Sequence, residues 1–203
     1  QNGFGAEQDL AALLPGVSIL AGLCFISCFQ DGPARVRHTG HGRLSLAPLT
    51  PGDPQAAAIA AVFAGCGVET ETLPAAEAAR LRKLVWNIPY NGLSVLADCL
   101  TDTLASAPPL LAAVQVIMEE VIEAAAACGV EIPRSFADEM KETIRNMPGS
   151  SPSMRLDWLN HRPLETEAIY GRVIAYAAAH GYDMKYARLL QAQLEYQESL
   201  YAG

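Results

Sequence analysis

Residues 81–96 read LRKLVWNIPYNGLSVL and carry the clearest structural signal in the chain. Its apolar residues recur with a spacing near 3.6, and the pattern extends on both sides, which predicts one long apolar helix over 75–98. Pro89 lies inside this helix and removes one backbone donor, so we expect a kink near Asn87.

Three polar residues interrupt this apolar helix on one face. Lys83, Asn87 and Asn91 stand at positions i, i+4 and i+8 and therefore share one side of the helix. An ammonium group and two amides so placed can donate to a carbonyl and bracket the hydroxyl or carboxylate oxygens of a small polar substrate. Spacing alone favours a structural interpretation instead. The stripe is then either a solvated helix face, because any surface helix shows such a stripe, or a set of amides that satisfy the ends of neighbouring helices.

The remainder of the chain after Pro74 is also helical in pattern. Helices are predicted over 109–128, 135–147, 153–160, 164–180 and 184–201. Ser135 and Ser153 are expected to cap their helices, and Glu165 and Glu167 to open the helix after Pro163. Capping alone accounts for Ser153 and both glutamates structurally.

The first third of the chain has a mixed α/β pattern. Strands are predicted over 19–29, 34–40 and 42–48, with turns at 31–33 and 40–42, so that the second and third strands could form a hairpin. Short Ala-rich helices are predicted over 6–14 and 54–65. We therefore place a boundary near residue 73, between a mixed region (1–73) and an all-helical region (74–203).

Composition excludes several classes of protein. The 203 residues carry 14 Lys and Arg against 22 Asp and Glu, a net charge of −8 that disfavours nucleic-acid binding. The longest apolar run, 16–29, is too short to span a membrane. Five cysteines without C-x-x-C spacing predict reduced thiols packed as small hydrophobic groups, and the four histidines show no metal-binding motif. Neither G-x-G-x-x-G nor a P-loop occurs.

Two motifs together resemble the ketopantoate reductase family. They are KLVWNIPYNGLSVL (83–96) and SPSMRLDWLNHRPLETEAIYG (151–171), and the similarity extends to QNGFG (1–5) and to 20–48. The resemblance implies a Rossmann-type domain that binds NADPH, followed by an all-α domain like that of 6-phosphogluconate dehydrogenase. Residues 1–73 then correspond to the end of the nucleotide-binding α/β domain and 74–203 to the substrate-binding and catalytic domain. A chain that starts at QNG would lack the preceding cofactor-binding segment of the family, and we expect it to have no catalytic activity by itself.

The resemblance also implies a reaction, hydride transfer from NADPH to the C2 ketone of ketopantoate. Lys83 matches the family's catalytic lysine and would act as general acid. The positions that match substrate-binding residues are Asn87, Asn91, Ser153 and Thr101, where Thr101 replaces an asparagine of some members. Those that match cofactor-binding residues are Asn2, Cys28 and Glu165, with Glu167 taking the place of Glu165 if the register slips by two.

Two other functions stay open at this point. The parent protein could reduce a related 2-oxo acid, because the Pro and aromatic residues between Asn87 and Asn91 depart from the family pattern. Alternatively, the chain could be an inert helical or dimerisation module, because it has no dinucleotide loop. In every case we expect a cytoplasmic protein without metal, and the apolar helical half suggests a homodimer.

Overall fold

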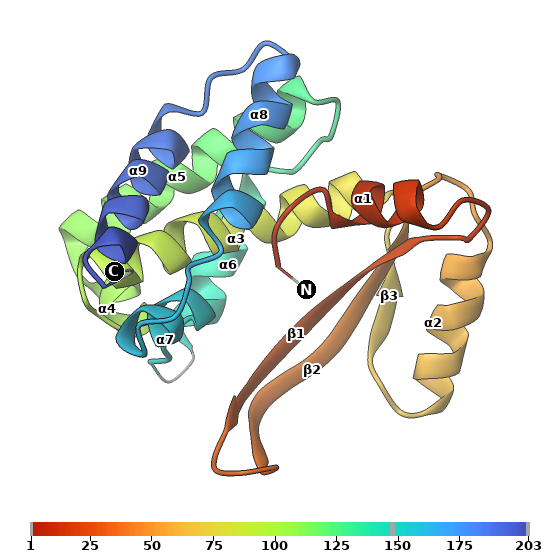
Figure 1. The fold of residues 1–203 in the computed structure, drawn as a ribbon, viewed down its shortest axis with the longest axis horizontal. Coiled ribbons are helices and arrows are strands. Elements are labelled where there is room, and N and C mark those ends of the chain that lie inside the picture. The colour runs from red at the N-terminus through yellow and green to blue at the C-terminus, as the bar shows by residue number, and fades with distance from the viewer. Residues whose placement is uncertain (1, 147–148, 202–203) are drawn as a thin grey trace. The chain divides into compact units, whose positions relative to one another are not determined.

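The structure, a computed structural model, describes residues 2–146 and 149–201 (Figure 1). It separates into two compact units, each described here by itself. The first unit comprises Gly5–Arg80, and the second comprises Leu81–Gly203 together with Asn2–Phe4. The division falls inside one helix, whereas the sequence pattern changes near residue 73.

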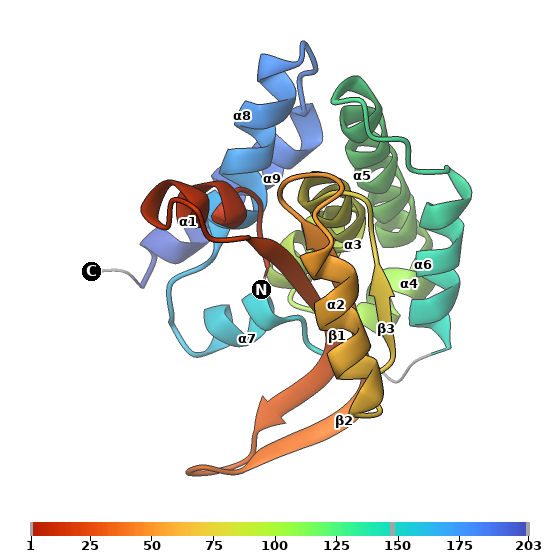
Figure 2. The ribbon, with the colours of Figure 1, turned by 90° about the vertical axis from the view of Figure 1, so that its right-hand side faces the viewer.

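The first unit is a small α/β structure, as the sequence predicts (Figure 2). Its sheet has the order β1-β2-β3, in which β1 and β2 are antiparallel and β2 and β3 are parallel. The elements are α1 (Ala6–Leu13), β1 (Leu20–Gln30), β2 (Val36–Pro48), α2 (Gln55–Gly65) and β3 (Thr70–Thr72). A buried ion pair between Glu7 and Arg80 holds α1 against the start of α3 (Ala76–Leu96).

The predicted turn at 40–42 is wrong, because β2 continues through it. Phe25 pairs with Arg43 but Ile26 pairs with His41, which leaves Gly42 as an extra residue in β2. This is a β-bulge: the long partner strand β1 keeps both halves of β2 paired, while Gly42 takes a φ of 142° that an L-residue rarely adopts. The hairpin therefore joins β1 to β2.

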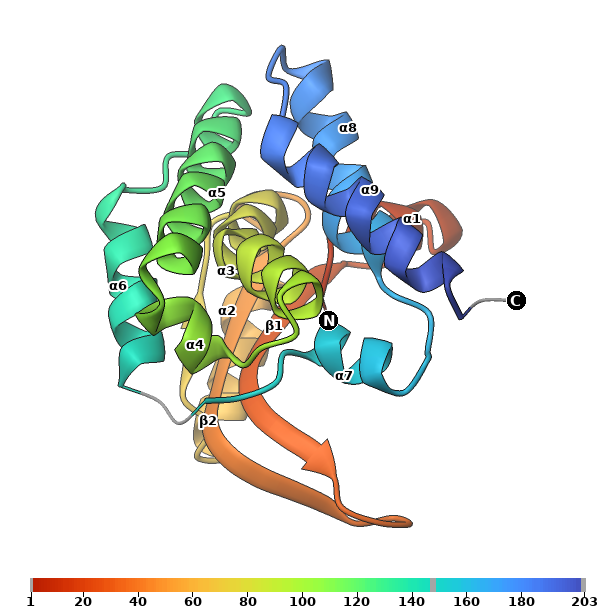
Figure 3. The same ribbon diagram turned by 90° about the vertical axis from the view of Figure 1, so that its left-hand side faces the viewer.

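The second unit is all-α, again as predicted (Figure 3). After α3 come α4 (Thr101–Ser106), α5 (Pro108–Ala127), α6 (Ser135–Arg145), α7 (Ser153–Leu159), the π-helical turn η1 (Glu167–Gly171), α8 (Arg172–Ala179) and α9 (Lys185–Ser199). The apolar face of α3 forms part of one core with side chains of the later helices, among them Met118, Val121, Val173 and Leu194. The short helix α4 was not among the predicted elements. The helix α3 runs unbroken through Pro89.

Two predicted helix caps are wrong. Ser135 and Ser153 are the first helical residues of α6 and α7, and neither helix has a side-chain cap. The residues before them, Arg134 and Pro152, occupy the cap positions, because each helix begins one residue earlier than the prediction assumed. Among the described residues, no helix has the length and apolarity to cross a membrane.

The prediction that all five cysteines pack as small hydrophobic groups is also wrong. Cys24, Cys28 and Cys66 are exposed. The two cysteines of β1 lie on the face opposite Ala21 and Leu23, which enter the small core of the first unit, and Cys66 lies just beyond the end of α2. Cys99 and Cys128 are half-buried against the core of the second unit.

Candidate functional site

The polar stripe of α3 is buried rather than solvated. Asn87 is 2% exposed and Asn91 is 1% exposed, and Lys83 is half-buried. The solvated-face interpretation is therefore wrong for the two asparagines, whose side chains the fold removes from solvent. Burying amides is unfavourable unless they find hydrogen-bond partners, so the partners of these residues are informative.

Asn87 finds a partner in a segment far away in sequence. Its Nδ2 donates to Oδ1 of Asn2 at 3.4 Å, a long hydrogen bond within the second unit. Asn2, which the family resemblance assigns to the cofactor, thus lies beside the stripe that the same resemblance assigns to the substrate.

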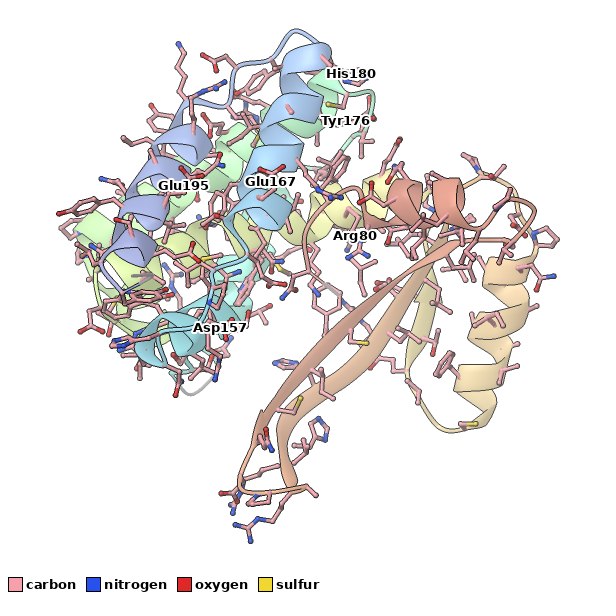
Figure 4. The ribbon with its side chains drawn as sticks, in the orientation of Figure 1. Arg80, Asp157, Glu167, Tyr176, His180 and Glu195 are labelled. Carbon is pink, nitrogen blue, oxygen red and sulfur yellow. The ribbon has the colours of Figure 1, made fainter. Side chains whose placement is uncertain are left out.

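The turn that carries Asn2 is held tightly against η1. The backbone N–H of Phe4 donates to the carbonyl of Ala168 at 2.8 Å, and the buried Phe4 ring packs 4.8 Å from the ring of Tyr176 on α8 (Figure 4). Gly3 has a φ of +85°, and a Cβ at this position would lie 2.7 Å from the Ala168 carbonyl oxygen. Only glycine allows this approach.

Asn91 has no such partner. Both Nδ2 and Oδ1 of its side chain are buried without a hydrogen bond among the described residues, although its backbone carbonyl accepts from Ser94 at 3.0 Å. An unpaired buried polar group costs roughly 1–3 kcal/mol. An amide kept in this state, on the same helix face as Lys83, has a free donor and a free acceptor to offer a bound ligand.

The far side of α3 is fixed by Tyr170. Its hydroxyl donates to the carbonyl of Ile88 at 2.9 Å, and a Cβ on Gly92 would lie 2.8 Å from that hydroxyl. Burial raises the pKa of Tyr170 above its ordinary value, so the phenol stays a donor. The sequence analysis missed Tyr170; the signal for it is Gly92, an isolated glycine inside a helix, which indicates a close neighbour.

Thr101 is engaged in positioning a backbone segment. Its Oγ1 accepts from the N–H of Ser150 at 3.1 Å, and its own N–H donates to the Ser150 carbonyl at 3.1 Å. The two hydroxyls are 3.3 Å apart. This double connection anchors the segment that leads into α7, where Ser153 is exposed at the first position. Ser150 is a second residue that the sequence analysis missed.

Glu165, or Glu167 if the register slips by two, is the residue that the family resemblance assigns to cofactor binding. Glu165 is exposed, and its carbonyl accepts from the N–H of Ile169 in the turn that holds Phe4. The carboxylate of Glu167 instead lies directly against Gly171, so that a Cβ added at Gly171 would overlap it. The same Cβ would lie 3.2 Å from Nε2 of Gln191 on α9, which places Gln191 nearby. Figure 4 shows Glu167 facing the helix that carries Glu195. Glu167 is thus directed to α9.

Cys28 belongs to the first unit, where it is exposed on β1 opposite His38. In the described part of the chain, no three His, Cys, Asp or Glu side chains gather as a metal ion would require. Among the predicted site residues of the second unit, a hydrogen bond joins Asn87 to Asn2, and α3 carries Lys83 and Asn91 on the same helix face.

Comparison with known proteins identifies the family. The family model described as ketopantoate reductase PanE/ApbA C terminal matches residues 75–198, and the one described as ketopantoate reductase PanE/ApbA matches residues 1–51. A 2-dehydropantoate 2-reductase from Nostoc sp. is 34% identical over 97% of this chain. This chain spans 63% of the length of that relative.

Solved structures agree with the sequence relatives. The crystal structure of 2-dehydropantoate 2-reductase from Geobacter metallireducens superimposes with a TM-score of 0.92 at 36% identity, covering 97% of this chain and 66% of that one. The enzyme from Methylococcus capsulatus has a TM-score of 0.89 at 27% identity, covering 100% and 65%. On its sequence and its fold, this chain belongs to the ketopantoate reductase family.

Proposed function

We propose that the protein to which this chain belongs reduces 2-dehydropantoate to pantoate with NADPH. The observation that carries the proposal is the buried stripe of α3, in which Lys83 shares a helix face with Asn91, whose amide is buried without a partner. Relatives named 2-dehydropantoate 2-reductase support the choice of substrate.

Each polar residue of the second unit receives a role in this proposal. Lys83 donates a proton to the C2 oxygen as negative charge develops there, a contribution of typically ~10²–10⁴-fold. Asn87 and Asn91 bind the hydroxyl side of the substrate, and Asn91 does so with amide atoms that nothing else occupies. Ser153 binds the carboxylate, with Thr101 acting on it through the Ser150 segment.

In this proposal the cofactor would lie beside Asn2, the hydrogen-bond partner of Asn87. A nicotinamide supplies the hydride that reduces C2. Asn2 accepts from Asn87 through its carbonyl oxygen, and its amide nitrogen is the kind of donor that a carboxamide needs. Cys28 and Glu165 complete the cofactor contacts, and both are exposed. Residues 1–73 would be the end of the nucleotide-binding domain and 74–203 the substrate domain, in a cytoplasmic homodimer.

The test compares two lysine variants of the full-length protein. Lys83→Met is expected to lower kcat by at least 100-fold while the circular dichroism spectrum stays unchanged. Lys185→Met, an exposed lysine on α9, is the matched control and should retain activity. Unchanged turnover in Lys83→Met would remove the lysine from the mechanism.

A second candidate is a reductase of a related 2-oxo acid. It is favoured by Thr101, a shorter hydroxyl side chain already bonded to Ser150 where some family members have an asparagine. Steady-state kinetics of the full-length protein on a panel of 2-oxo acids, each with NADPH and NADH, separate the two. A higher kcat/KM for another acid than for ketopantoate would favour this candidate. Micromolar NADPH binding by the 203-residue chain would contradict the remaining alternative, an inert helical or dimerisation module.

A further inference from the structure

An ion pair within the second unit joins α7 to the residues that follow α3, and neither partner has a role in the reaction proposed above. Nη2 of Arg155 donates to Oδ1 of Asp98 at 2.7 Å, and Nη1 donates to the hydroxyl of Ser151 at 3.1 Å. The Arg155 side chain is 15% exposed, whereas that of Asp98 is 62% exposed. Arg155 is thus the largely buried partner, and Asp98 is the carboxylate that holds it.

Asp98 stands where a helix usually has glycine. The N–H of Cys99 donates to the carbonyl of Ser94 and the N–H of Asp98 to the carbonyl of Val95, both at 3.2 Å, which is the hydrogen-bond pattern with which many helices end. In this pattern the residue after the helix takes a left-handed backbone, and Asp98 has a φ of 44°. Glycine adopts that conformation without strain, whereas a residue with a Cβ does not.

The charge of Asp98 is also unfavourable for α3. A carboxylate at the C-terminal end of a helix lies at the negative end of the helix dipole. Backbone strain and charge both argue against aspartate here, so the local stability of α3 does not explain this residue. A residue that breaks two local rules is expected to gain from a contact elsewhere, and the contact that Asp98 makes is with Arg155.

The contact with Arg155 fixes geometry more than it adds stability. Ion pairs with a solvent-exposed partner contribute little to the free energy of unfolding. Nε of Arg155 is moreover buried without a hydrogen bond among the described residues, which is itself unfavourable. A planar guanidinium held at its other two nitrogens, however, has a defined position and orientation.

The helix α7 is held at three successive places. The Thr101–Ser150 hydrogen bonds anchor the segment before it, and Met154, 1% exposed, enters the core of the second unit. Arg155 lies about 100° further round the helix than Met154, so the ion pair fixes the rotation of α7 about its own axis. That rotation sets the direction of the exposed Ser153 hydroxyl on the same turn.

We propose that Asp98 and Arg155 are positioning residues for substrate binding, because their ion pair fixes the place of the Ser153 hydroxyl relative to Asn91 on α3. The inference rests on the proposed function, in which Ser153 binds the substrate carboxylate and Asn91 the hydroxyl side. Every 2-oxo acid has this carboxylate, so the role does not depend on which acid is the substrate. Hydride transfer to C2 leaves the carboxylate charge unchanged, so a misplaced Ser153 should raise KM and leave kcat nearly unaltered.

Steady-state kinetics of the full-length protein with NADPH and ketopantoate, together with thermal unfolding, test the pair. Asp98→Gly gives α3 a glycine end but removes the carboxylate, so we expect a higher melting temperature and a KM for ketopantoate raised roughly tenfold. The value of kcat and the KM for NADPH should stay within about twofold of the unmodified enzyme. Asp98→Asn keeps an oxygen acceptor for Arg155 and should restore most of the affinity. A merely structural role predicts a lower melting temperature and no such split between KM and kcat.

A double variant tests whether the two residues act as a pair. Arg155→Met should raise KM about as much as Asp98→Gly, and combining the two should raise it no further, because both changes remove the same contact. Arg188→Met is the matched control. It breaks an ion pair of similar length, 2.9 Å to Asp183 at the start of α9, and should leave KM unchanged.

An unchanged KM in Asp98→Gly would overturn the positioning role. So would single-variant increases that multiply in the double variant, or an equal increase in Arg188→Met. If the unmodified enzyme reduces no 2-oxo acid with either NADPH or NADH, the proposed function fails and the positioning role fails with it. Turnover by the unmodified enzyme with an unchanged KM in the variants removes the positioning role alone, so the two failures are distinguishable.

Discussion

The side chains of Asn87 and Asn2 meet across 85 residues of sequence, with Nδ2 of the first 3.4 Å from Oδ1 of the second. This contact joins the middle of α3 to a turn that is itself bonded to η1 through Phe4 and Ala168. It is the point at which the proposed substrate residues and a proposed cofactor residue become neighbours. Its geometry depends on how closely the turn can approach η1.

Gly3 controls that approach, and Gly3→Ala should destabilise the second unit by about 2–4 kcal/mol through backbone strain and overlap with Ala168. Gly181 has nearly the same φ, +83° against +85°, but nothing lies within 4 Å of its added Cβ. Gly181→Ala therefore introduces backbone strain without steric overlap, and its free energy of unfolding should fall by about 1 kcal/mol. Urea unfolding of both variants measures the difference, and equal losses would contradict the close contact.

Asn91→Leu should make the protein more stable and less able to bind substrate. Leucine has a similar shape and removes two buried polar atoms that have no partner among the described residues, a gain of about 1–3 kcal/mol. Asn87→Leu is the control, because it breaks the bond to Asn2 and should lower stability. Thermal unfolding of each variant, with KM for the full-length enzyme, checks this. A lower melting temperature for Asn91→Leu would show that the amide is satisfied.

Gly92 and Tyr170 should be coupled in a double-mutant cycle. Gly92→Ala alone is expected to destabilise, because its Cβ would lie 2.8 Å from the Tyr170 hydroxyl. Tyr170→Phe alone loses the bond to Ile88, about 0.5–1.5 kcal/mol. With the hydroxyl gone, alanine at 92 fits better and adds about 1 kcal/mol of helix propensity. Additive free energies of unfolding in the double variant would refute the contact.

Glu120 should make stability depend on pH. Burial raises the pKa of its carboxyl group above the ordinary 4.5, although the N–H groups at the start of α9 oppose this. A raised pKa in the folded state means that stability is fully present below the ordinary value and is lost as pH rises through the raised value. The free energy of unfolding of the unmodified chain, minus that of Glu120→Gln, should therefore fall from pH 4 to 7. A flat difference would show that burial does not shift this group.

Glu120→Gln should also lower stability throughout this range. Glutamine has one carbonyl oxygen for two donors, the N–H groups of Tyr186 and Ala187, so one hydrogen bond is lost at a cost of about 1 kcal/mol. Hydrogen exchange of these two amides would report the loss directly.

Elements with a strong local signal could be predicted from the order of residues. The apolar period of 81–96 is long and regular, so α3 and the shared face of Lys83, Asn87 and Asn91 could be predicted from it. The change from a mixed α/β pattern to an all-helical one could also be predicted, because it depends on the spacing of apolar residues close together in the sequence.

Whether that shared face is solvated or buried depends on the packing of the whole unit, since an i, i+4 stripe has the same spacing in both cases. Tertiary structure also places Gly40–His41–Gly42 within β2, because pairing with β1 outweighs the local turn signal. The contact of Asn2 with Asn87 and the insertion of Tyr170 at Gly92 join segments about 80 residues apart. Such contacts arise from packing of the whole unit, and no local pattern encodes them.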